Sequence, residues 1–208
     1  MNNNNLFEDS FQQFAETIFN LVKKEKYDEL LKSFTCLSIP PNSVPFNNTL
    51  KLELCSQMGI GDESKLYIVS YENPRDYNIF KYLHIECSAF GAWQSYLLHK
   101  LWHILPLYWH GLYGKRKYIL TTKDLKDIKP IPKEEKQKFN VSPYIKQEGN
   151  VFYVSCCYWS EFSGLVRETV EIKIENNKAV TLQLLKYDFE PDNTQHEVLY
   201  EYNCGILY

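Results

Sequence analysis

The chain of 208 residues lacks most of the motifs that identify a catalytic chemistry. It has no Gly-x-Ser-x-Gly turn and no Cys-x-x-Cys pair. The sequence Gly59-Ile60-Gly61 lacks the third glycine of a dinucleotide fingerprint and the lysine of a P-loop. These absences remove the usual reasons to propose an enzyme, so we predict a non-catalytic protein without a cofactor.

Long apolar runs and a strong charge of one sign are also missing. A membrane span needs about 18 consecutive apolar residues, and Lys100, His103 and Pro106 interrupt the most apolar segment. The asparagine-rich N-terminus has neither the basic nor the apolar region of a signal peptide. The net charge of -3 argues against a general nucleic-acid binder. We therefore expect a cytoplasmic protein with no membrane and no nucleic-acid partner.

The six cysteines are scattered through a chain that is too large for a disulfide scaffold. We expect reduced and mostly buried thiols. Cys156 and Cys157 are adjacent in an apolar run that is typical of a strand, so their side chains should point to opposite faces and cannot share a metal site.

Apolar periodicity predicts three helices, over Ser10–Lys24, Tyr27–Phe34 and Gly91–Leu105. Pro106 should end or kink the third helix. Strands are expected over Leu50–Cys55, Leu66–Tyr71, Ile79–Cys87, Val151–Trp159, Val166–Ile174, Ala179–Phe189 and Glu197–Tyr202. The pair Asn176-Asn177 is a candidate two-residue hairpin turn, because asparagine tolerates positive φ.

This order predicts an α+β fold, in which N-terminal helices and one central helix pack on a curved antiparallel sheet that ends in a four-strand meander. We expect a single domain over residues 1–208, with a flexible tail at 1–8 and a surface excursion at 121–147. The order of elements is similar to the cone-shaped folds of the nuclear-transport-factor-2-like superfamily. That resemblance implies a curved sheet around a pocket, and it depends on element order without a residue motif.

Aromatic rings and histidines are concentrated between Ala92 and Tyr113. Such a segment suits either a core helix with a solvent-exposed edge or the wall of a recognition pocket. A helical projection places Trp93 and Leu97 on the core arc, and Tyr96, His99 and His103 on the opposite side.

His99 and His103 have the spacing of two zinc ligands on a helix, with His110 as a conceivable third ligand. Lys100 occupies the position where the helical metalloprotease motif has glutamate, so we expect no metal site. Partly buried or hydrogen-bonded histidines, or a binding surface, are the alternatives.

Two acidic residues are candidate pocket groups. Glu168 falls on the apolar face of its predicted strand, where a carboxylate needs a partner or a pocket unless a bend exposes it. Glu86 shares a strand face with His84, which gives a possible base and an orienting carboxylate. A change of phase near Leu184-Leu185 in a later strand indicates a β-bulge, a feature that often bends a sheet around a cavity.

Charge is unevenly distributed along the chain. The segment Gly114–Lys138 has nine basic and four acidic residues, whereas residues 167–208 have eight acidic and four basic ones. These segments are either solvated faces or surfaces that steer a charged partner. The tract Tyr108–Tyr118 mixes aromatics with cations, which suits a protein-binding hot spot better than a single-strand nucleic-acid binder.

We therefore expect a cytoplasmic protein that binds another protein. In its compactness, acidic balance and divided charge it resembles bacterial immunity proteins that neutralise toxins. The alternative is a small-molecule-binding or enzymatic domain with a pocket lined by His84, Glu86, His103, Trp109 and Glu168. The complete set of candidate binding residues is His84, Glu86, His99, His103, Trp109, His110, Tyr113, Arg116 and Glu168.

Overall fold

Two long antiparallel strands form the centre of the computed structural model, which describes residues 5–24, 26–38, 52–57, 63–68, 83–104, 116–179 and 194–205. These strands, Val151–Ser160 (β7) and Gly164–Glu175 (β8), pair from Val151 opposite Lys173 to Ser160 opposite Gly164. Both are longer than predicted, because each strand supplies partners along the whole length of the other.

Shorter strands complete this sheet on both sides. Arg116–Ile119 (β5) and Tyr144–Glu148 (β6) share the outer side of β7. Thr194–Tyr200 (β10) and Lys178–Ala179 (β9) share the outer side of β8. The consecutive strands β6 to β9 are joined as hairpins, whereas β10 returns to pair with β8.

The turn between β8 and β9 confirms the predicted hairpin. Asn176 and Asn177 have φ values of 49° and 59°, and Glu175 pairs with Lys178 across them. Positive φ at both central residues is the geometry that two-residue hairpins favour.

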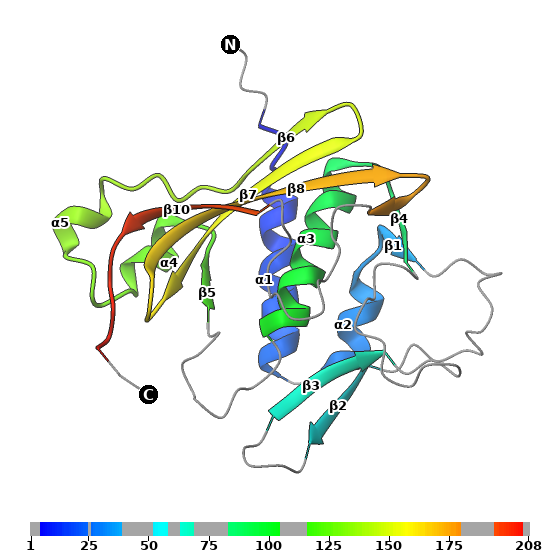
Figure 1. Cartoon of the computed structure of the whole chain (residues 1–208), viewed down its shortest axis with the longest axis horizontal. Helices are drawn as coiled ribbons and strands as arrows, with labels where there is room; N and C mark the ends of the chain where they lie inside the picture. Colours follow the sequence, from blue (N-terminus) through cyan, green and yellow to red (C-terminus); the bar gives the residue numbers. More distant parts are fainter. Residues whose placement is uncertain are drawn as a thin grey trace.

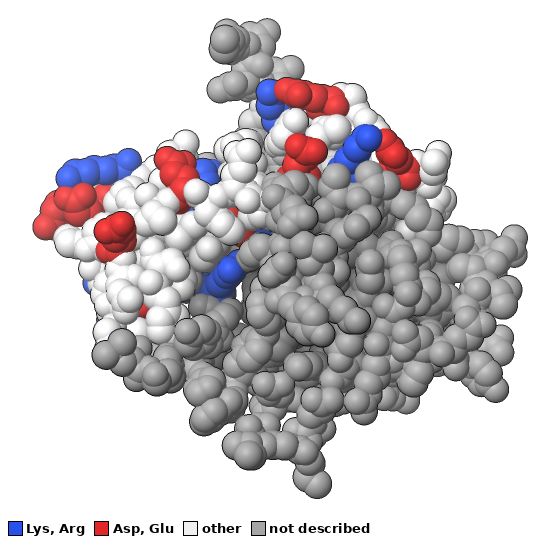
Figure 2. Space-filling model, in the orientation of Figure 1, with Lys and Arg blue, Asp and Glu red and all other residues white. Residues whose placement is uncertain are grey.

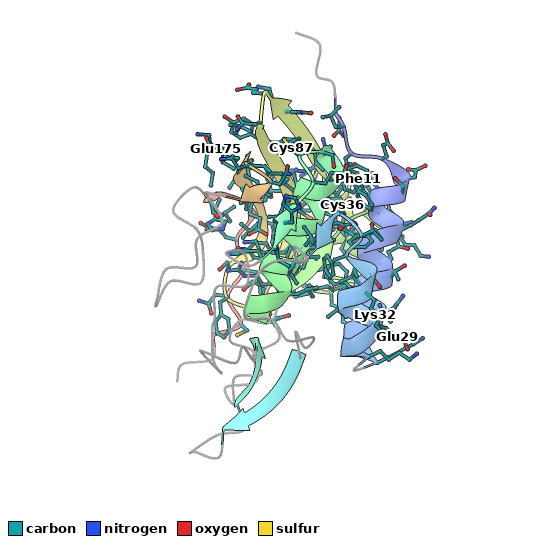
Figure 3. The ribbon with its side chains drawn as sticks, turned by 90° about the vertical axis from the view of Figure 1, so that its right-hand side faces the viewer. Phe11, Glu29, Lys32, Cys36, Cys87 and Glu175 are labelled. Carbon is teal, nitrogen blue, oxygen red and sulfur yellow. The ribbon has the colours of Figure 1, made fainter. Side chains whose placement is uncertain are left out.

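Three helices lie on one side of the sheet, which confirms the α+β fold with a curved antiparallel sheet (Figure 1). They are Asp9–Lys23 (α1), Tyr27–Ser33 (α2) and Ala89–Ile104 (α3), close to the three predicted segments. A side view shows α3 between α1 and the sheet, with Phe11 on the side of α1 that faces α3 (Figure 3). The indole of Trp93 in α3 donates a hydrogen bond to the Phe11 carbonyl, at 2.9 Å.

The central position of α3 explains its composition. All its residues from Gly91 to Leu101 are buried, so the helix is covered on every side. Tyr96 and His99, which the helical projection placed opposite the core arc, are fully buried. Gly91 is required near the start of the helix, because a Cβ there would lie 2.1 Å from the Glu86 carbonyl oxygen.

The segment predicted as a surface excursion, 121–147, is an integral part of the fold. It contains the short helices Thr122–Lys126 (α4) and Lys133–Lys136 (α5) and then strand β6. Leu125, Ile128, Ile131 and Val141 are buried in a second apolar cluster, on the sheet face opposite α3. The prediction missed this cluster because prolines and lysines dominate the local pattern, while its apolar residues are widely spaced.

Residues 5–8, which belong to the expected flexible tail 1–8, contact the rest of the fold. The Asn5 side chain accepts a hydrogen bond from the Ile145 backbone at 3.0 Å, and the Leu6 backbone donates to the Ile145 carbonyl at 2.9 Å. The Phe7 ring packs edge-on against Trp93, with 5.0 Å between the ring centres. Residues 5–8 are therefore tied to both β6 and α3.

Two small antiparallel pairs lie outside the main sheet: Leu37–Ser38 (β1) with His84–Ile85 (β4), and Leu52–Gln57 (β2) with Glu63–Ile68 (β3). The strands β2 and β3 are shifted toward each other relative to the prediction, because their pairing extends to Gln57 opposite Glu63. Of the strand expected over Ile79–Cys87, residues 79–82 lie outside the described residues, as do residues 180–189 and the bulge expected at Leu184-Leu185. Among the described helices, none combines the length and apolar character that a membrane crossing requires.

Candidate functional site

Glu168 lies near the middle of β8, on the face that packs against α3, and its side chain is fully buried. Its neighbours on that face are apolar: Val166, Val170 and Ile172. The alternative in which a bend exposes this carboxylate is wrong, because β8 pairs continuously with β7 through this position. A buried carboxylate needs compensating contacts, and three other elements supply them.

The helix α3 provides the closest contacts. The Tyr96 hydroxyl donates a short hydrogen bond to Glu168 Oε1, and Lys100 Nζ lies 2.9 Å from Oε2. Oε2 accepts no hydrogen bond of standard geometry, so the Lys100 contact is an ion pair. Tyr96 and Lys100 are four residues apart, and this spacing places both side chains on one side of the helix. The Lys100 side chain is only 2% exposed.

The strands β5 and β10 provide the remaining contacts. The Tyr118 hydroxyl donates to Glu168 Oε1 at 3.4 Å, and an Arg116 guanidinium nitrogen lies 3.7 Å from Oε2. His196 sits directly opposite Glu168 in the β8–β10 pairing, with its Nε2 also 3.7 Å from Oε2. We call Glu168, Tyr96, Lys100, Arg116, Tyr118 and His196 the Glu168 cluster.

The Glu168 cluster extends from the core to the surface. The Arg116 side chain is 24% exposed and that of His196 is 36% exposed, in contrast to the buried Lys100. The Arg116 guanidinium also lies over the Tyr158 ring, 4.5 Å from its centre. Arg116 and His196 are therefore the members of the cluster that an external molecule could reach.

The charges around Glu168 determine its protonation state. Burial by itself would raise the pKa of this carboxyl, but the Lys100 charge, the His196 ring 3.7 Å away and the Tyr96 hydrogen bond lower it to about 2. Burial, followed by the nearby Glu168 charge, raises the pKa of the Tyr96 hydroxyl well above its usual value. Glu168 is thus a carboxylate and Tyr96 a neutral phenol throughout the physiological pH range.

These protonation states suit an anchor better than a catalytic group. A general acid or base works best when its pKa lies near the operating pH, and both groups are shifted away from neutrality. Through Tyr96 and Lys100 the carboxylate fixes α3 to the sheet, and through Arg116 and His196 it contacts the outer strands β5 and β10.

The other predicted pocket residues lie elsewhere. The Ile85 backbone of β4 donates to the Asn177 carbonyl, so His84 and Glu86 lie near the far end of β8. At about 3.3 Å per residue, the seven residues from Glu168 to Glu175 place that end about 23 Å from Glu168. The pocket that combined His84 and Glu86 with Glu168 is therefore not assembled.

The remaining site predictions fall partly outside the described structure. His99 is buried in α3, one residue before Lys100. The His103 side chain and the residues Trp109, His110 and Tyr113 lie outside the described residues. Within the described ranges, no group of three or more histidine, cysteine or acidic residues could hold a metal ion.

Sequence reasoning missed Tyr96, Lys100, Tyr118 and His196 as partners of Glu168. The spacing of Tyr96 and Lys100 is a usable signal once a buried carboxylate has been recognised, because both residues must face the same layer. No comparable signal exists for Tyr118 or His196, since β5 and β10 reach Glu168 only through the pairing of distant strands.

The described cysteines Cys36, Cys87, Cys156, Cys157 and Cys204 are free thiols. Cys156 and Cys157 are buried in the clusters on opposite faces of the sheet, as predicted. Burial is the main cause that raises the pKa of Cys36 and of Cys157 to about 11, and it raises the pKa of Cys156 well above its usual value. None of these three thiols is activated as a nucleophile.

Positive and negative side chains are interspersed on the described part of the surface in view (Figure 2). On β6, Lys146 pairs with Glu148 at 2.5 Å, and on β8 Lys173 pairs closely with Glu175. The basic segment that the sequence indicates is described from Arg116 onward, and most of it lies on α4, α5 and their connections.

Comparison of the chain with known protein families, with curated proteins and with solved structures finds no match.

Proposed function

We propose that this chain is a non-catalytic, cytoplasmic protein that acts by binding another protein. The supporting observation is that six described groups have pKa values that are shifted away from neutral pH. The pKa is raised for groups whose ordinary pKa already lies above neutrality, and it is lowered for one carboxyl group. These groups are Cys36, Tyr96, Lys146, Cys156, Cys157 and Glu168.

The same observation argues against an active centre in the described part of the chain. Active sites concentrate groups whose pKa values have been moved toward the working pH. Here burial and pairing hold each shifted group in its resting protonation state, which is the behaviour of structural groups. The free thiols fit the reducing cytoplasm.

The toxin-neutralising role expected from the sequence is a specific form of this proposal. An inhibitor needs a rigid scaffold more than reactive groups, since a preorganised surface loses less entropy on binding. The contacts of Glu168 with α3, β5 and β10 provide such rigidity.

A small-molecule site is the second candidate, and one observation favours it. The buried Glu168 cluster reaches solvent through Arg116 and His196, so a polar ligand could contact charged groups that continue into the core. This site would include Arg116, but it excludes His84 and Glu86.

Affinity purification of the tagged full-length protein from its own cells, read by native mass spectrometry, tests both candidates. A partner protein bound at fixed stoichiometry, and rebound by the purified chain in calorimetry, is the result we expect. A toxic partner whose effect co-expression abolishes would establish the inhibitor role. A retained small molecule without a protein partner, lost in His196→Ala, would instead support the pocket and overturn the proposal.

A further inference from the structure

Four lysines protrude from the part of the fold formed by α4, α5 and their connections, residues 121–141, which we call the α4–α5 lobe. Lys123, Lys126, Lys129 and Lys133 are exposed, and none of them forms an ion pair with a described residue. Two of them, Lys123 and Lys126, are neighbours three residues apart on α4.

Most of the lobe's own acidic groups are already engaged. The Asp124 carboxylate accepts hydrogen bonds from the Thr121 backbone and hydroxyl in a capping box. Asp127 lies 3.7 Å from Lys117, and Glu135 lies 2.5 Å from Lys138. The four protruding lysines therefore outnumber the carboxylates left to balance them.

The backbone that carries these lysines is firmly held. Leu125, Ile128 and Ile131 are buried against the sheet in the second apolar cluster. The Arg167 guanidinium donates to the Asn140 carbonyl at 2.5 Å, and Lys136 Nζ donates to the Lys126 carbonyl at 2.8 Å. A partner that docks here would have to order the lysine side chains but not the backbone.

We propose that the α4–α5 lobe is the docking surface for an acidic protein partner, an inference that rests on the proposed protein-binding function. Asp127 lies between Lys126 and Lys129 in the sequence, and Glu134 and Glu135 directly follow Lys133. Positive charges that are separated by carboxylates in this way match a protein surface of discrete carboxylates. A continuous polyphosphate would be repelled by these carboxylates and by the overall charge of -3. Nucleic acids and anionic membranes therefore fit less well. Complementary charge of this kind accelerates encounter and selects the partner.

The experiment uses the full chain and a fluorescein-labelled peptide in which six glutamates alternate with serine. The test variant combines Lys123→Glu, Lys126→Glu, Lys129→Glu and Lys133→Glu. The matched control makes the same charge change at exposed lysines in β6, in α2 and in the connection between α1 and α2, by combining Lys24→Glu, Lys26→Glu, Lys32→Glu and Lys146→Glu. Figure 3 shows Lys32 pointing away from the core.

Fluorescence anisotropy at low ionic strength should show peptide binding to the wild type. The lobe variant should bind at least about tenfold more weakly, while the control stays within about threefold. Binding should weaken with added salt, because the Debye length is only about 10 Å at 0.1 M. Thermal unfolding of each variant checks that the fold is retained.

Three results would overturn the inference: no peptide binding by the wild type, an equal loss in both variants, or tighter binding to a 20-nucleotide single strand or to phosphatidylserine vesicles. These outcomes differ from failure of the proposed function. If affinity purification finds a protein partner whose binding the lobe variant retains, the function stands and this docking surface is wrong.

Discussion

Replacing Glu168 with glutamine tests the central structural argument. The change keeps the size of the side chain but removes its charge, which leaves Lys100 buried without its anion. Breaking a buried ion pair from one side typically costs about 3–5 kcal/mol. The pKa gives an independent value: lowering it from the ordinary 4.5 to about 2 corresponds to about 3 kcal/mol of stabilisation of the charged form by folding.

Urea unfolding followed by circular dichroism at pH 7 measures this loss. We expect Glu168→Gln to lower the free energy of unfolding by about 3 kcal/mol. Glu148→Gln is the matched control, because it removes the carboxylate of a solvent-exposed pair with Lys146, whose loss should leave the free energy of unfolding nearly unchanged. A loss below about 1 kcal/mol in Glu168→Gln would refute the view that this carboxylate holds α3 to the sheet.

The pH dependence supplies the sign of the effect. Because folding lowers the pKa of Glu168, its stabilising contribution is complete above about pH 4.5 and disappears as the pH falls toward 2. The difference in stability between wild type and Glu168→Gln should therefore shrink over this interval. A difference that stays constant from pH 7 to pH 2 would assign the loss to packing and not to charge.

Three further substitutions test other parts of the fold by the same unfolding assay. Gly164→Ala should destabilise the chain by more than about 2 kcal/mol, because residue 164 has a φ of 80° and an added Cβ would lie 1.9 Å from the Tyr200 carbonyl oxygen; a near-neutral result would place the C-terminal segment elsewhere. Thr121→Ala should cost about 1 kcal/mol through loss of the capping box with Asp124, whereas Thr121→Ser should recover most of it. Phe152→Ala should cost about 3–5 kcal/mol, since this fully buried ring fills the main core, and a loss under 1 kcal/mol would contradict that placement.

Much of the fold could be predicted because its signals are local. The helix α1 begins and ends within a residue of its predicted bounds, since its apolar residues repeat at helical spacing behind a polar start. The strand β8 alternates between buried and half-buried residues from Val166 onward, and Asn176-Asn177 identifies the hairpin after it. The lobe could not be predicted in this way, because its buried residues meet only when they pack on the sheet.

Only one part of the candidate site could be predicted, namely that the Glu168 carboxylate needs a partner. The sequence placed Glu168 on an apolar strand face, and the structure supplies Tyr96 and Lys100 from a helix about 70 residues earlier in the chain. The predicted combination with His84 and Glu86 failed because shared chemistry does not imply proximity. His84 and Glu86 lie near one end of β8, whereas Glu168 lies near its middle.

Local sequence patterns suffice to predict the class of fold, the approximate bounds of the most regular helices and strands, and the need of Glu168 for a partner. These follow from backbone geometry and from the cost of burying a charge, and both can be assessed within a few residues. Three features become evident only in the folded chain: β5 and β6 share one side of β7, β10 returns to β8, and Arg116 and His196 lie beside the buried carboxylate. Strand pairing joins segments that are far apart in the chain, so its outcome depends on the packing of the whole molecule and not on any local pattern.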